Sequence, residues 1–274
     1  MPAVSIIIAA LEAEATLGDA LASALAQTWG DFEIVIAPDE PRDYAAFAAL
    51  DPRIRILPGV PAPTGPGPAR NRALAAARGA WVAVLDADDR WSPNYLAALL
   101  PAAEGHGASF GRTSVLDEAG AELRSIPPLD YRGTASYAVF ARAFGSFHGL
   151  ARRGAQRQWR HVFAEDVLFD LETLARQGGK AAYNPEAVYY LSARPDSATR
   201  RTVFIDEIGK SYAAIISMIR NGHTGVPRVE QAKAIAVFES WGEMNGKYLA
   251  ARASDPALAY QRFVAASERE TNLS

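Results

Sequence analysis

A short apolar run that ends in a cluster of aspartates constrains this chain more than any other feature. Residues 80–85 (AWVAVL) are apolar without interruption, and a run of this length predicts a strand that is buried on both faces, as in a parallel sheet. Asp86, Asp88 and Asp89 follow directly. We therefore expect them at the carboxyl edge of the sheet, where open α/β folds bind their ligands.

Two of these aspartates are spaced for a metal ion. In extended geometry Asp86 and Asp88 point to the same side of the chain. Two hard oxygen ligands suit Mg²⁺ or Mn²⁺, and such an ion completes its shell with water and substrate phosphates. Ser92 and Pro93 predict the N-cap and the first residue of a helix after the turn. For an isolated D-x-D pattern, a solvated turn with only a capping role is the alternative interpretation.

The first hundred residues alternate between strand and helix patterns. Strands are predicted over residues 4–9, 32–37, 54–57 and 80–85, and helices over residues 17–25 and 69–78. This order, with its short connections, predicts an α/β fold with a doubly wound, mostly parallel sheet flanked by helices. Asp39 follows the second strand, so we expect it at the same edge of the sheet as Asp86.

The rest of the chain is less regular until it becomes helical. We predict paired strands over residues 108–115 and 121–125, a helix over 131–143 and a strand over 146–151. A helix from Glu165 and a strand over 181–191 follow. Further helices are predicted over 202–220, 228–251 and 256–269. We therefore divide the chain into an α/β domain of residues 1–200 and a helical C-terminal extension of residues 201–274. The extension is interpreted as an added subdomain, a homodimer surface or a lid.

Composition excludes several classes of protein. With 28 Lys and Arg against 31 Asp and Glu, the net charge is −3, so no nucleic-acid footprint is expected. The chain has no cysteine, which excludes disulfides, thiol catalysis and cysteine-bound metals. No apolar run approaches the roughly 18 residues of a spanning helix. We expect a cytoplasmic protein whose membrane contact, if any, is peripheral and at the inner face.

Four segments resemble the family 2 glycosyltransferases of the GT-A fold, in order and spacing. They read VSIII, ALAQTWGDFEIVI, PGPARNRALAAARGAWVAVLDADDRWSPNYL and AEDVLFDLETLARQGG. The resemblance is strong over residues 4–100 and 164–199 and weak between them. It implies an inverting, nucleotide-sugar-dependent hexosyltransferase that uses Mn²⁺ or Mg²⁺. It also implies that residues 1–105 form the nucleotide-sugar-binding half and residues 106–200 the acceptor-side half.

The resemblance assigns roles to five residues of the nucleotide-binding half. It implies that Asp39 binds the base or ribose of the nucleotide and that Arg70 and Asn71 lie close to the nucleotide. A cation at a helix N-terminus suits phosphate recognition. It also implies that Asp88 is the direct metal ligand and that Asp86 serves the ribose and the metal.

The resemblance also implies a general base. Asp166 matches the carboxylate that takes the proton of the attacking hydroxyl in inverting members, a role that needs only hydrogen-bond reach. Glu165 and Asp166 at a helix start are also what the helix dipole favours, so a structural role is the alternative. Arg194 is the candidate for the donor diphosphate. His148 and His161 are interpreted as structural histidines that lie near enough to approach the site.

Departures from the family pattern keep a second interpretation open. Pro38 stands where many members have the first of two aspartates, Glu40 and Pro41 replace Gly-Ser, and Glu12 replaces an asparagine after the first strand. These changes touch the nucleotide pocket, so the alternative is a non-catalytic relative that binds nucleotide-sugar or a partner protein. A nucleotidylyltransferase or a dinucleotide-dependent oxidoreductase would need a glycine-rich loop, which this chain lacks.

The donor and acceptor are predicted only by class. A UDP-sugar is the expected donor, and the expected acceptor is a glycan or lipid-linked precursor of a cell-envelope polysaccharide. Residues 109–160 are expected to build the acceptor wall, through the aromatic residues Tyr131, Tyr137, Phe140, Phe147 and Trp159. The same stretch is basic, with Arg142, Arg152, Arg153, Arg157 and Arg160, which would suit an acidic glycan, a lipid diphosphate or a membrane surface.

Overall fold

The computed structural model describes residues 1–145, 147–155, 158–193 and 202–272. Its strands are β1 (Val4–Ala10), β2 (Phe32–Pro38), β3 (Ile54–Ile56), β4 (Trp81–Val84), β5 (Arg90–Trp91), β6 (Ala108–Leu116), β7 (Glu122–Ile126), β8 (Ala135–Ser136), β9 (Gly149–Arg152) and β10 (Lys180–Ser192). Its helices are α1 (Leu17–Leu25), α2 (Ala45–Ala48), α3 (Pro66–Ala76), α4 (Tyr95–His106), α5 (Tyr137–Ala143), α6 (Glu165–Arg176), α7 (Thr202–Arg220), α8 (Gln231–Ser254) and α9 (Tyr260–Asn272). Two 3₁₀ turns, 153–155 and 228–230, complete the described elements.

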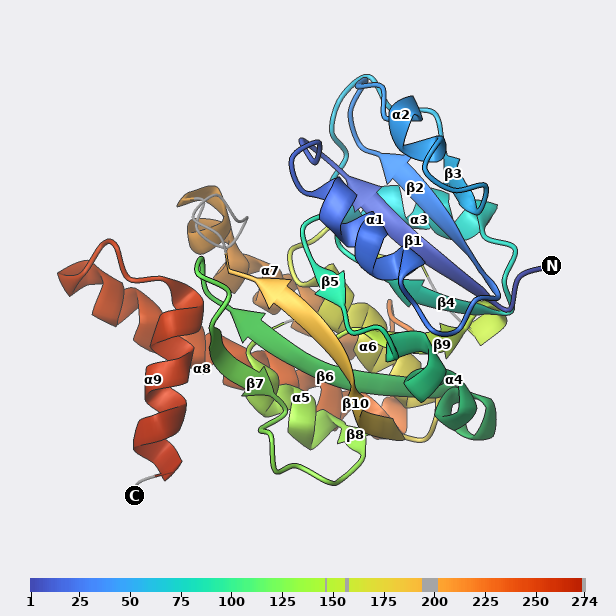
Figure 1. Ribbon diagram of the computed structural model, residues 1–274. Helices are drawn as coiled ribbons and strands as arrows, with labels where there is room; N and C mark the ends of the chain where they lie inside the picture. Colours follow the sequence, from blue (N-terminus) through green and yellow to red (C-terminus); the bar gives the residue numbers. More distant parts are fainter. Residues whose placement is uncertain (146, 156–157, 194–201, 273–274) are drawn as a thin grey trace.

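One mixed sheet with helices on its faces forms the frame of the molecule (Figure 1). The strand order is β3-β2-β1-β4-β9-β6-β10-β5, with β7 beside β6 and β8 beside β10. The four strands from β3 to β4 are parallel, which confirms the doubly wound sheet predicted for the first hundred residues. The chain leaves β1 to one side toward β2 and returns on the other side at β4, so the crevice at their carboxyl ends is a ligand-binding position.

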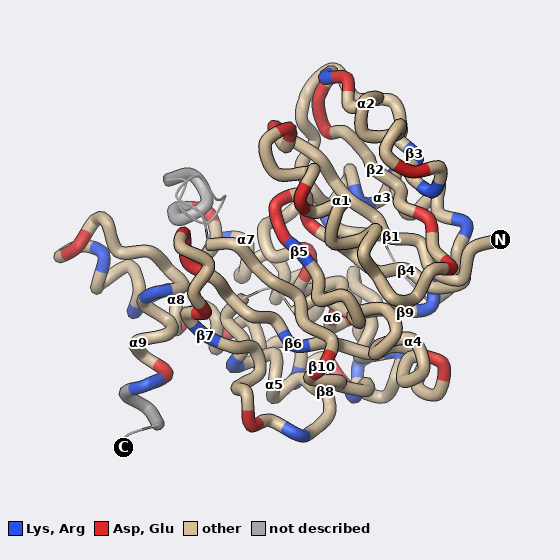
Figure 2. The backbone as a smooth tube through the Cα atoms, in the orientation of Figure 1, with Lys and Arg blue, Asp and Glu red and all other residues tan. Residues whose placement is uncertain are grey.

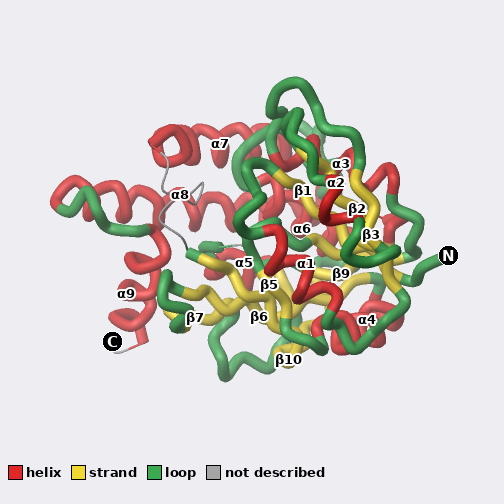
Figure 3. Tube along the Cα trace, turned by 45° about the horizontal axis from the view of Figure 1, so that its top comes forward, coloured by secondary structure: helices red, strands yellow, loops and turns green. Residues whose placement is uncertain are grey.

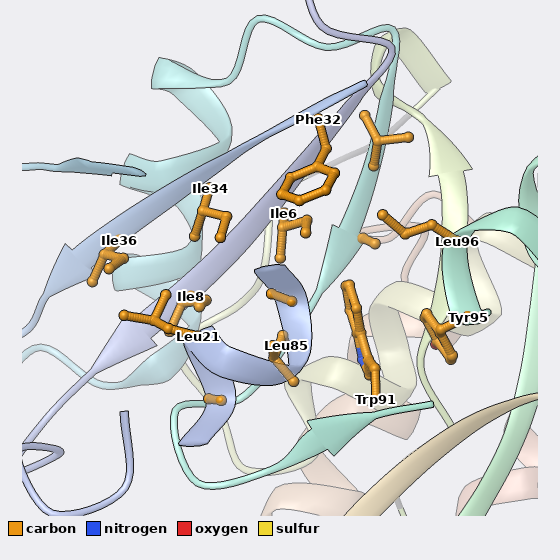
Figure 4. Close-up of a cluster of buried hydrophobic side chains, with 14 of the residues drawn as sticks. Ile6, Ile8, Leu21, Phe32, Ile34, Ile36, Leu85, Trp91, Tyr95 and Leu96 are labelled. Atoms are coloured by element: carbon orange, nitrogen blue, oxygen red, sulfur yellow. The ribbon is translucent and has the colours of Figure 1, made fainter. Parts of the chain in front are cut away.

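Strand β1 is apolar at almost every position because both faces of the sheet are covered. Figure 4 shows Ile6 and Ile8 on the side of β1 that α1 covers, in a cluster that residues of α4 also join, whereas Ile7 faces the opposite side with residues of α3 and α6. Successive residues of a strand point to opposite faces. A buried central strand therefore needs an unbroken apolar run, which is the pattern that the sequence carries.

The order of the elements agrees with prediction, but several ends differ. Helix α3 begins at Pro66 and not at residue 69, because prolines are accepted in the first turn of a helix. The predicted cap at Ser92 is wrong: Asn94 is the N-cap of α4. Ser92 Oγ instead accepts the Val188 N–H at 3.0 Å. Helix α5 covers only the second half of the range predicted for it.

The second half of the molecule has its own core, which the C-terminal helices complete. Residues of β6, α5 and α6 share one apolar cluster with α7 and α8, including Phe140, Leu171, Ile215 and Phe238. Figure 3 shows α7, α8 and α9 gathered beside this end of the sheet. Within the described ranges, none of the helices combines the length and the apolar character that crossing a bilayer would require.

A buried arginine holds the last helix in place. Arg124 of β7 is 6% exposed and pairs with Glu268 of α9 at 2.7 Å. It also donates to Gln261 Oε1 at 3.1 Å and to the Ala143 carbonyl at 2.6 Å. A buried charge requires such partners. The extension is therefore joined to the α/β part by a polar anchor as well as by apolar packing.

Candidate active site

A cavity of about 480 Å³ opens where β1 and β4 end, within the range typical of small-molecule sites. It is lined by the turns after both strands, the start of α6 and residues of the C-terminal helices. Seven carboxyl groups line it, those of Glu12, Asp39, Asp86, Asp88, Asp89, Glu165 and Asp166. Among the described lining residues, only Arg70 carries a basic side chain. Figure 2 shows part of this acidic concentration on the loops beside β5.

Arg70 joins the aspartate turn to the start of α6. Its Nη2 donates to Asp86 Oδ1 and its Nη1 to Glu165 Oε1, each at 2.6 Å. Burial opposes a charge on Arg70, but Asp86 and Glu165 raise its pKa above the ordinary value. Burial likewise would raise the pKa of Asp86, but Arg70 and His148 hold it well below the usual range. Asp86 is therefore an anion held by a cation.

The turn after β4 is fixed from below by β10. The Tyr189 hydroxyl donates to Asp89 Oδ2 at 2.8 Å and accepts the Asp86 N–H at 3.1 Å. Asp89 also accepts the Ser192 N–H. Burial, with Asp88 and Asp86 nearby, raises the pKa of Asp89 well above its ordinary value. The third aspartate of the cluster thus orients the turn.

His148 lies closer to the aspartates than its sequence position suggests. The side chain is 4% exposed and its Nε2 is 3.4 Å from Asp86 Oδ2, within ion-pair range but without hydrogen-bond geometry. Its ring packs 5.0 Å from the ring of Tyr189. No local pattern around His148 indicates this contact, because the strand order alone brings β9 beside β4.

The residues of the turn fit a divalent ion that is completed by a substrate. Within the described ranges, no group of three His, Asp or Glu side chains forms a ready metal centre. Asp88 is half-buried and lines the cavity next to Asp86. Mg²⁺ and Mn²⁺ are commonly held by one or two carboxylates together with substrate phosphates. This donor set, of carboxylate oxygens alone, matches that chemistry.

Asp166 lies in the first turn of α6 and faces the cavity. Ala164 precedes the helix in a left-handed conformation, with φ of 62°, and this sharp entry brings Glu165 and Asp166 to the site. Burial raises the pKa of Glu165 to about 7. The positive charge of Arg70 acts in the opposite direction, but Arg70 also pairs with Asp86. Asp166 is half-buried. The two neighbouring acids thus have different surroundings, one tied to Arg70 and one lining open space.

Asp39 holds the loop that precedes α3. Its Oδ1 accepts the Thr64 hydroxyl at 2.6 Å, and its Oδ2 accepts the N–H groups of Thr64 and Gly65 at 2.9 and 2.7 Å. The side chain is buried yet borders the cavity. His161 is exposed, and its ring lies beside Gly65 of the same loop. Asp39 is therefore brought to the site together with the loop.

One predicted site residue, Asn71, is not among the described residues that line the cavity. Asn71 points to the opposite side of α3, where its amide donates to the Trp159 carbonyl at 2.9 Å and accepts the Trp159 N–H at 2.8 Å. It joins α3 to the segment before α6. Arg194 lies outside the described residues.

The departures from the family pattern form a support for the edge of the cavity. Glu40 is buried, accepts the Glu12 N–H and accepts the Tyr44 hydroxyl at 2.7 Å. The same Tyr44 oxygen accepts the Ala13 N–H at 3.0 Å. Glu12 itself has φ of 50°. Glu40 therefore fixes the turn after β1. Its presence in place of the family's glycine supports the edge of the pocket and does not fill the pocket.

The aromatic residues expected in an acceptor wall lie elsewhere. Phe140 and Phe147 are each 1% exposed and belong to the second core, and Trp159 stacks on Phe169 at 3.9 Å. Tyr137 is buried as well, and Tyr131 packs against Tyr183. These side chains were candidates for stacking on a sugar, and their contacts show that they serve packing instead.

The described arginines of the basic stretch do not line the cavity either. Arg152 lies over the ring of Trp81 and Arg153 donates to the Gly79 carbonyl at 2.6 Å, both at the amino end of β4. Arg160 donates to the His223 carbonyl, and Arg142 is exposed on α5. Arg157 lies outside the described residues. The described arginines therefore give no support to an acidic acceptor in this cavity.

Sequence reasoning also missed residues that lie in and behind the site. Tyr212, Trp241, Asn245, Tyr260 and Gln261 from the C-terminal helices line the main cavity. A void of about 10 Å³ lies behind Asp166, lined in part by His148, Asp170 and Thr173. The spacing of Asp166 and Asp170, one helical turn apart, is the sequence signal that places Asp170 on the same face of α6 as Asp166.

Comparison with known proteins agrees with the geometry. The family model "Glycosyl transferase family 2" matches residues 5–135. The succinoglycan biosynthesis protein ExoO of Rhizobium meliloti (strain 1021) is 31% identical over 242 residues, which cover 80% of this chain and 69% of ExoO. The UDP-Glc:alpha-D-GlcNAc-diphosphoundecaprenol beta-1,3-glucosyltransferase WfgD of Escherichia coli is 38% identical over 96 residues, 34% of this chain and 38% of WfgD.

Solved structures show the same fold at lower identity. S. aureus TarS 1-349 in complex with UDP-GlcNAc has a TM-score of 0.64 and 18% identity, over 86% of this chain and 71% of that chain. The mannosyltransferase PcManGT from Pyrobaculum calidifontis, in complex with GDP-Man and Mn²⁺, has a TM-score of 0.60 and 18% identity, over 99% and 79%. The GT-A fold predicted from the sequence is confirmed, and the chain belongs to glycosyltransferase family 2.

Proposed function

We propose that this chain is a metal-dependent, inverting glycosyltransferase. It moves a sugar from a nucleoside-diphosphate donor to a hydroxyl of a glycan or lipid-linked acceptor in cell-envelope polysaccharide assembly. The observation that carries the proposal is that Asp86, Asp88 and Asp166 line one cavity, with Arg70 bonded between the turn and the start of α6. A polysaccharide role is supported by ExoO, and a UDP-sugar donor by WfgD and TarS.

The charge of the cavity supports metal dependence. Seven carboxyl groups and one arginine line it among the described residues, and a nucleoside diphosphate brings further negative charge. Asp88, with Asp86, would hold Mg²⁺ or Mn²⁺, and the ion when bound would offset the charge on the leaving diphosphate. The mannosyltransferase PcManGT, which shares the fold, forms a complex with GDP-Man and Mn²⁺, and this supports the choice of ion.

Asp166 is proposed as the general base. The acceptor hydroxyl oxygen forms a bond to the anomeric carbon while the bond from that carbon to the diphosphate oxygen breaks on the opposite face. The bonding electron pair leaves with the nucleoside diphosphate. The hydroxyl proton passes to the Asp166 carboxylate, which must lie within hydrogen-bond reach of it. Arg70 fixes the neighbouring Glu165 and so sets where the first turn of α6 stands.

The remaining site residues are proposed in supporting roles. Asp39 would bind the base or ribose, and the Thr64–Gly65 contacts would have to rearrange or be shared when a donor enters. Asn71 would act through the Trp159 main chain. Contact of Arg194 with the diphosphate stays a prediction. A cytoplasmic location with peripheral contact at the inner membrane face, and a homodimer through α7–α9, also stay predictions.

A thermal-shift panel tests the proposal. UDP, GDP, CDP and TDP are each added with and without Mn²⁺ to wild-type protein, to Asp88→Asn and to Glu104→Gln, which alters an exposed carboxyl on α4. A ligand that binds only the folded chain raises apparent stability. We expect stabilisation by one nucleotide, dependent on Mn²⁺, kept in Glu104→Gln and lost in Asp88→Asn.

The same panel separates the alternatives. Release of nucleoside diphosphate from the matching nucleotide-sugar is measured alongside the thermal shift. A shift without any release would favour the non-catalytic relative, and no shift with any nucleotide would remove the donor site from the proposal.

A further inference from the structure

The cavity has a second wall, and it differs in chemistry from the first. Helices α7, α8 and α9 contribute Ile208, Tyr212, Trp241, Asn245, Tyr248, Tyr260 and Gln261. None of these lining residues is charged, whereas the seven carboxyl groups come from the strand ends and turns of the sheet and from the start of α6. Figure 1 shows how helices far along the sequence reach the end of the sheet where the aspartate turn lies. The extension therefore contributes residues to the lining of the cavity.

The aromatic rings of this wall are held rigidly. Tyr212 and Trp241 meet edge to face at 6.2 Å, and Tyr248 meets Tyr260 edge to face at 5.1 Å. The Trp241 indole donates to the Phe140 carbonyl at 2.8 Å, and the Tyr248 hydroxyl donates to the Leu258 carbonyl at 3.0 Å. Polar atoms of these two rings are thus used inside the protein. What they offer the cavity is apolar ring surface.

Two other polar side chains belong to the wall. Asn245 is 8% exposed and borders the cavity. The Tyr260 hydroxyl is buried and has no hydrogen-bond partner among the described residues. Buried amides and hydroxyls are ordinarily hydrogen-bonded. An amide that both donates and accepts, beside ring surface, is what recognises a sugar hydroxyl.

The wall stands next to the proposed base. Ser211 Oγ of α7 accepts the Phe163 N–H at 3.4 Å, which fixes α7 beside the entry to α6. Burial first, then Tyr260 and Asp166, raise the pKa of Tyr212 well above its ordinary value. Tyr212, Tyr260 and Asp166 all line the main cavity. A group bound against the wall would therefore share the cavity with Asp166.

We propose that α7–α9 form the acceptor subsite, which takes an uncharged sugar residue and presents one of its hydroxyls to Asp166. This inference rests on the proposed function. The uncharged wall and the carboxyl-rich opposite side both disfavour a uronic acid or another acidic sugar, because like charges repel at close range. The subsite replaces the acceptor wall that the sequence placed at residues 109–160.

Kinetics with simple glycosides test the subsite. Methyl glucoside, methyl galactoside and methyl glucuronide are the acceptor probes, and hydrolysis of the donor by water is measured without them. Asn245→Ala and Tyr260→Phe are compared with Lys247→Ala, an exposed position on α8. We expect the KM for a neutral glycoside to rise at least tenfold in Asn245→Ala and severalfold in Tyr260→Phe. In Lys247→Ala, both the acceptor KM and donor hydrolysis should stay within twofold of the wild-type values.

The outcomes separate the subsite from the donor site. An unchanged acceptor KM in both wall variants would overturn the subsite. Use of methyl glucuronide as readily as the neutral glycosides would also overturn it. So would a wild type that hydrolyses donor but transfers sugar to none of the glycosides. If Asn245→Ala is unfolded, Tyr260→Phe decides, since it removes one oxygen only. Failure of the wild type to hydrolyse any donor would instead count against the proposed function.

Discussion

The guanidinium of Arg70 donates a 2.6 Å hydrogen bond to Oδ1 of Asp86, and this contact ties α3 to the turn after β4. The same guanidinium reaches Glu165 of α6 at 2.6 Å. Arg70 is 5% exposed, so both contacts are shielded from water. Removing one partner of a buried ion pair leaves an uncompensated charge, which costs far more than a surface pair contributes. Arg70 therefore joins the parts of the site and also contributes a positive charge to it.

Arg70→Met should destabilise the fold strongly. It leaves Asp86 and Glu165 without their shared cation, and we expect the free energy of unfolding in urea to fall by about 3–5 kcal/mol. Arg78→Ala removes an exposed arginine just after α3, and it should change the free energy of unfolding by less than about 0.5 kcal/mol. Adding Glu165→Gln to Arg70→Met should recover part of the loss. A loss below about 1 kcal/mol in Arg70→Met would mean that water reaches the pair.

The local signals in the sequence predicted the frame of the site, and the long-range contacts could not be predicted. The apolar runs of β1, β2 and β4, and the acidic turn after β4, are visible within short windows because a buried parallel strand needs every position apolar. The Arg70–Glu165 contact joins residues 95 positions apart. It depends on strand order, which no window contains.

The strand predicted over residues 146–151 is present as β9, Gly149–Arg152, but its place beside β4 and the C-terminal wall of the cavity could not be predicted. The antiparallel pairing of β9 with β4 joins segments far apart in the sequence. The sequence of an amphipathic helix such as α7 predicts which face is apolar, but it does not predict which part of the chain covers that face. Asn245 reads as an ordinary polar position on a long helix until the fold turns it toward the cavity. His148 carried no local pattern at all.

Two glycine substitutions should move stability in opposite directions. A Cβ on Gly79 would lie 2.6 Å from the Ser5 nitrogen, main chain that cannot move aside, so Gly79→Ala should cost about 1–3 kcal/mol. Gly105 of α4 has open space around a new Cβ, and alanine there should add about 0.4–1 kcal/mol by restricting the unfolded chain. Urea unfolding of both variants measures the difference. Equal effects would contradict the close approach of Gly79 to β1.

Stability should depend on pH through Asp170. Burial first, then the charge of Asp166, raise the pKa of this buried carboxyl well above its ordinary value of 3.8. The folded chain thus keeps a proton that the unfolded chain loses, so the free energy of unfolding falls as pH rises above 3.8 toward the folded-state pKa. Asp170→Asn lacks this contribution. Its Tm relative to wild type should therefore rise steadily across that window and then level off.

The control for Asp170 is a carboxyl without burial. Asp19→Asn removes an exposed acid from the first turn of α1, and its Tm difference from wild type should show no such rise. A flat difference for Asp170→Asn between about pH 4 and neutrality would mean that the carboxyl ionises freely, for instance through water in the adjoining void.

Asp166→Asn should separate chemistry from donor binding. The amide keeps the shape of the side chain but accepts no proton, so we expect turnover of sugar transfer to fall by about 10²- to 10⁴-fold. Because the donor is bound by other groups, the thermal shift with nucleotide and Mn²⁺ should remain. Asp170→Asn, one turn later on α6, should keep turnover within threefold, since that side chain lines only the small void. Initial rates at saturating donor measure both variants. Wild-type turnover in Asp166→Asn would require a different base at this edge of the sheet.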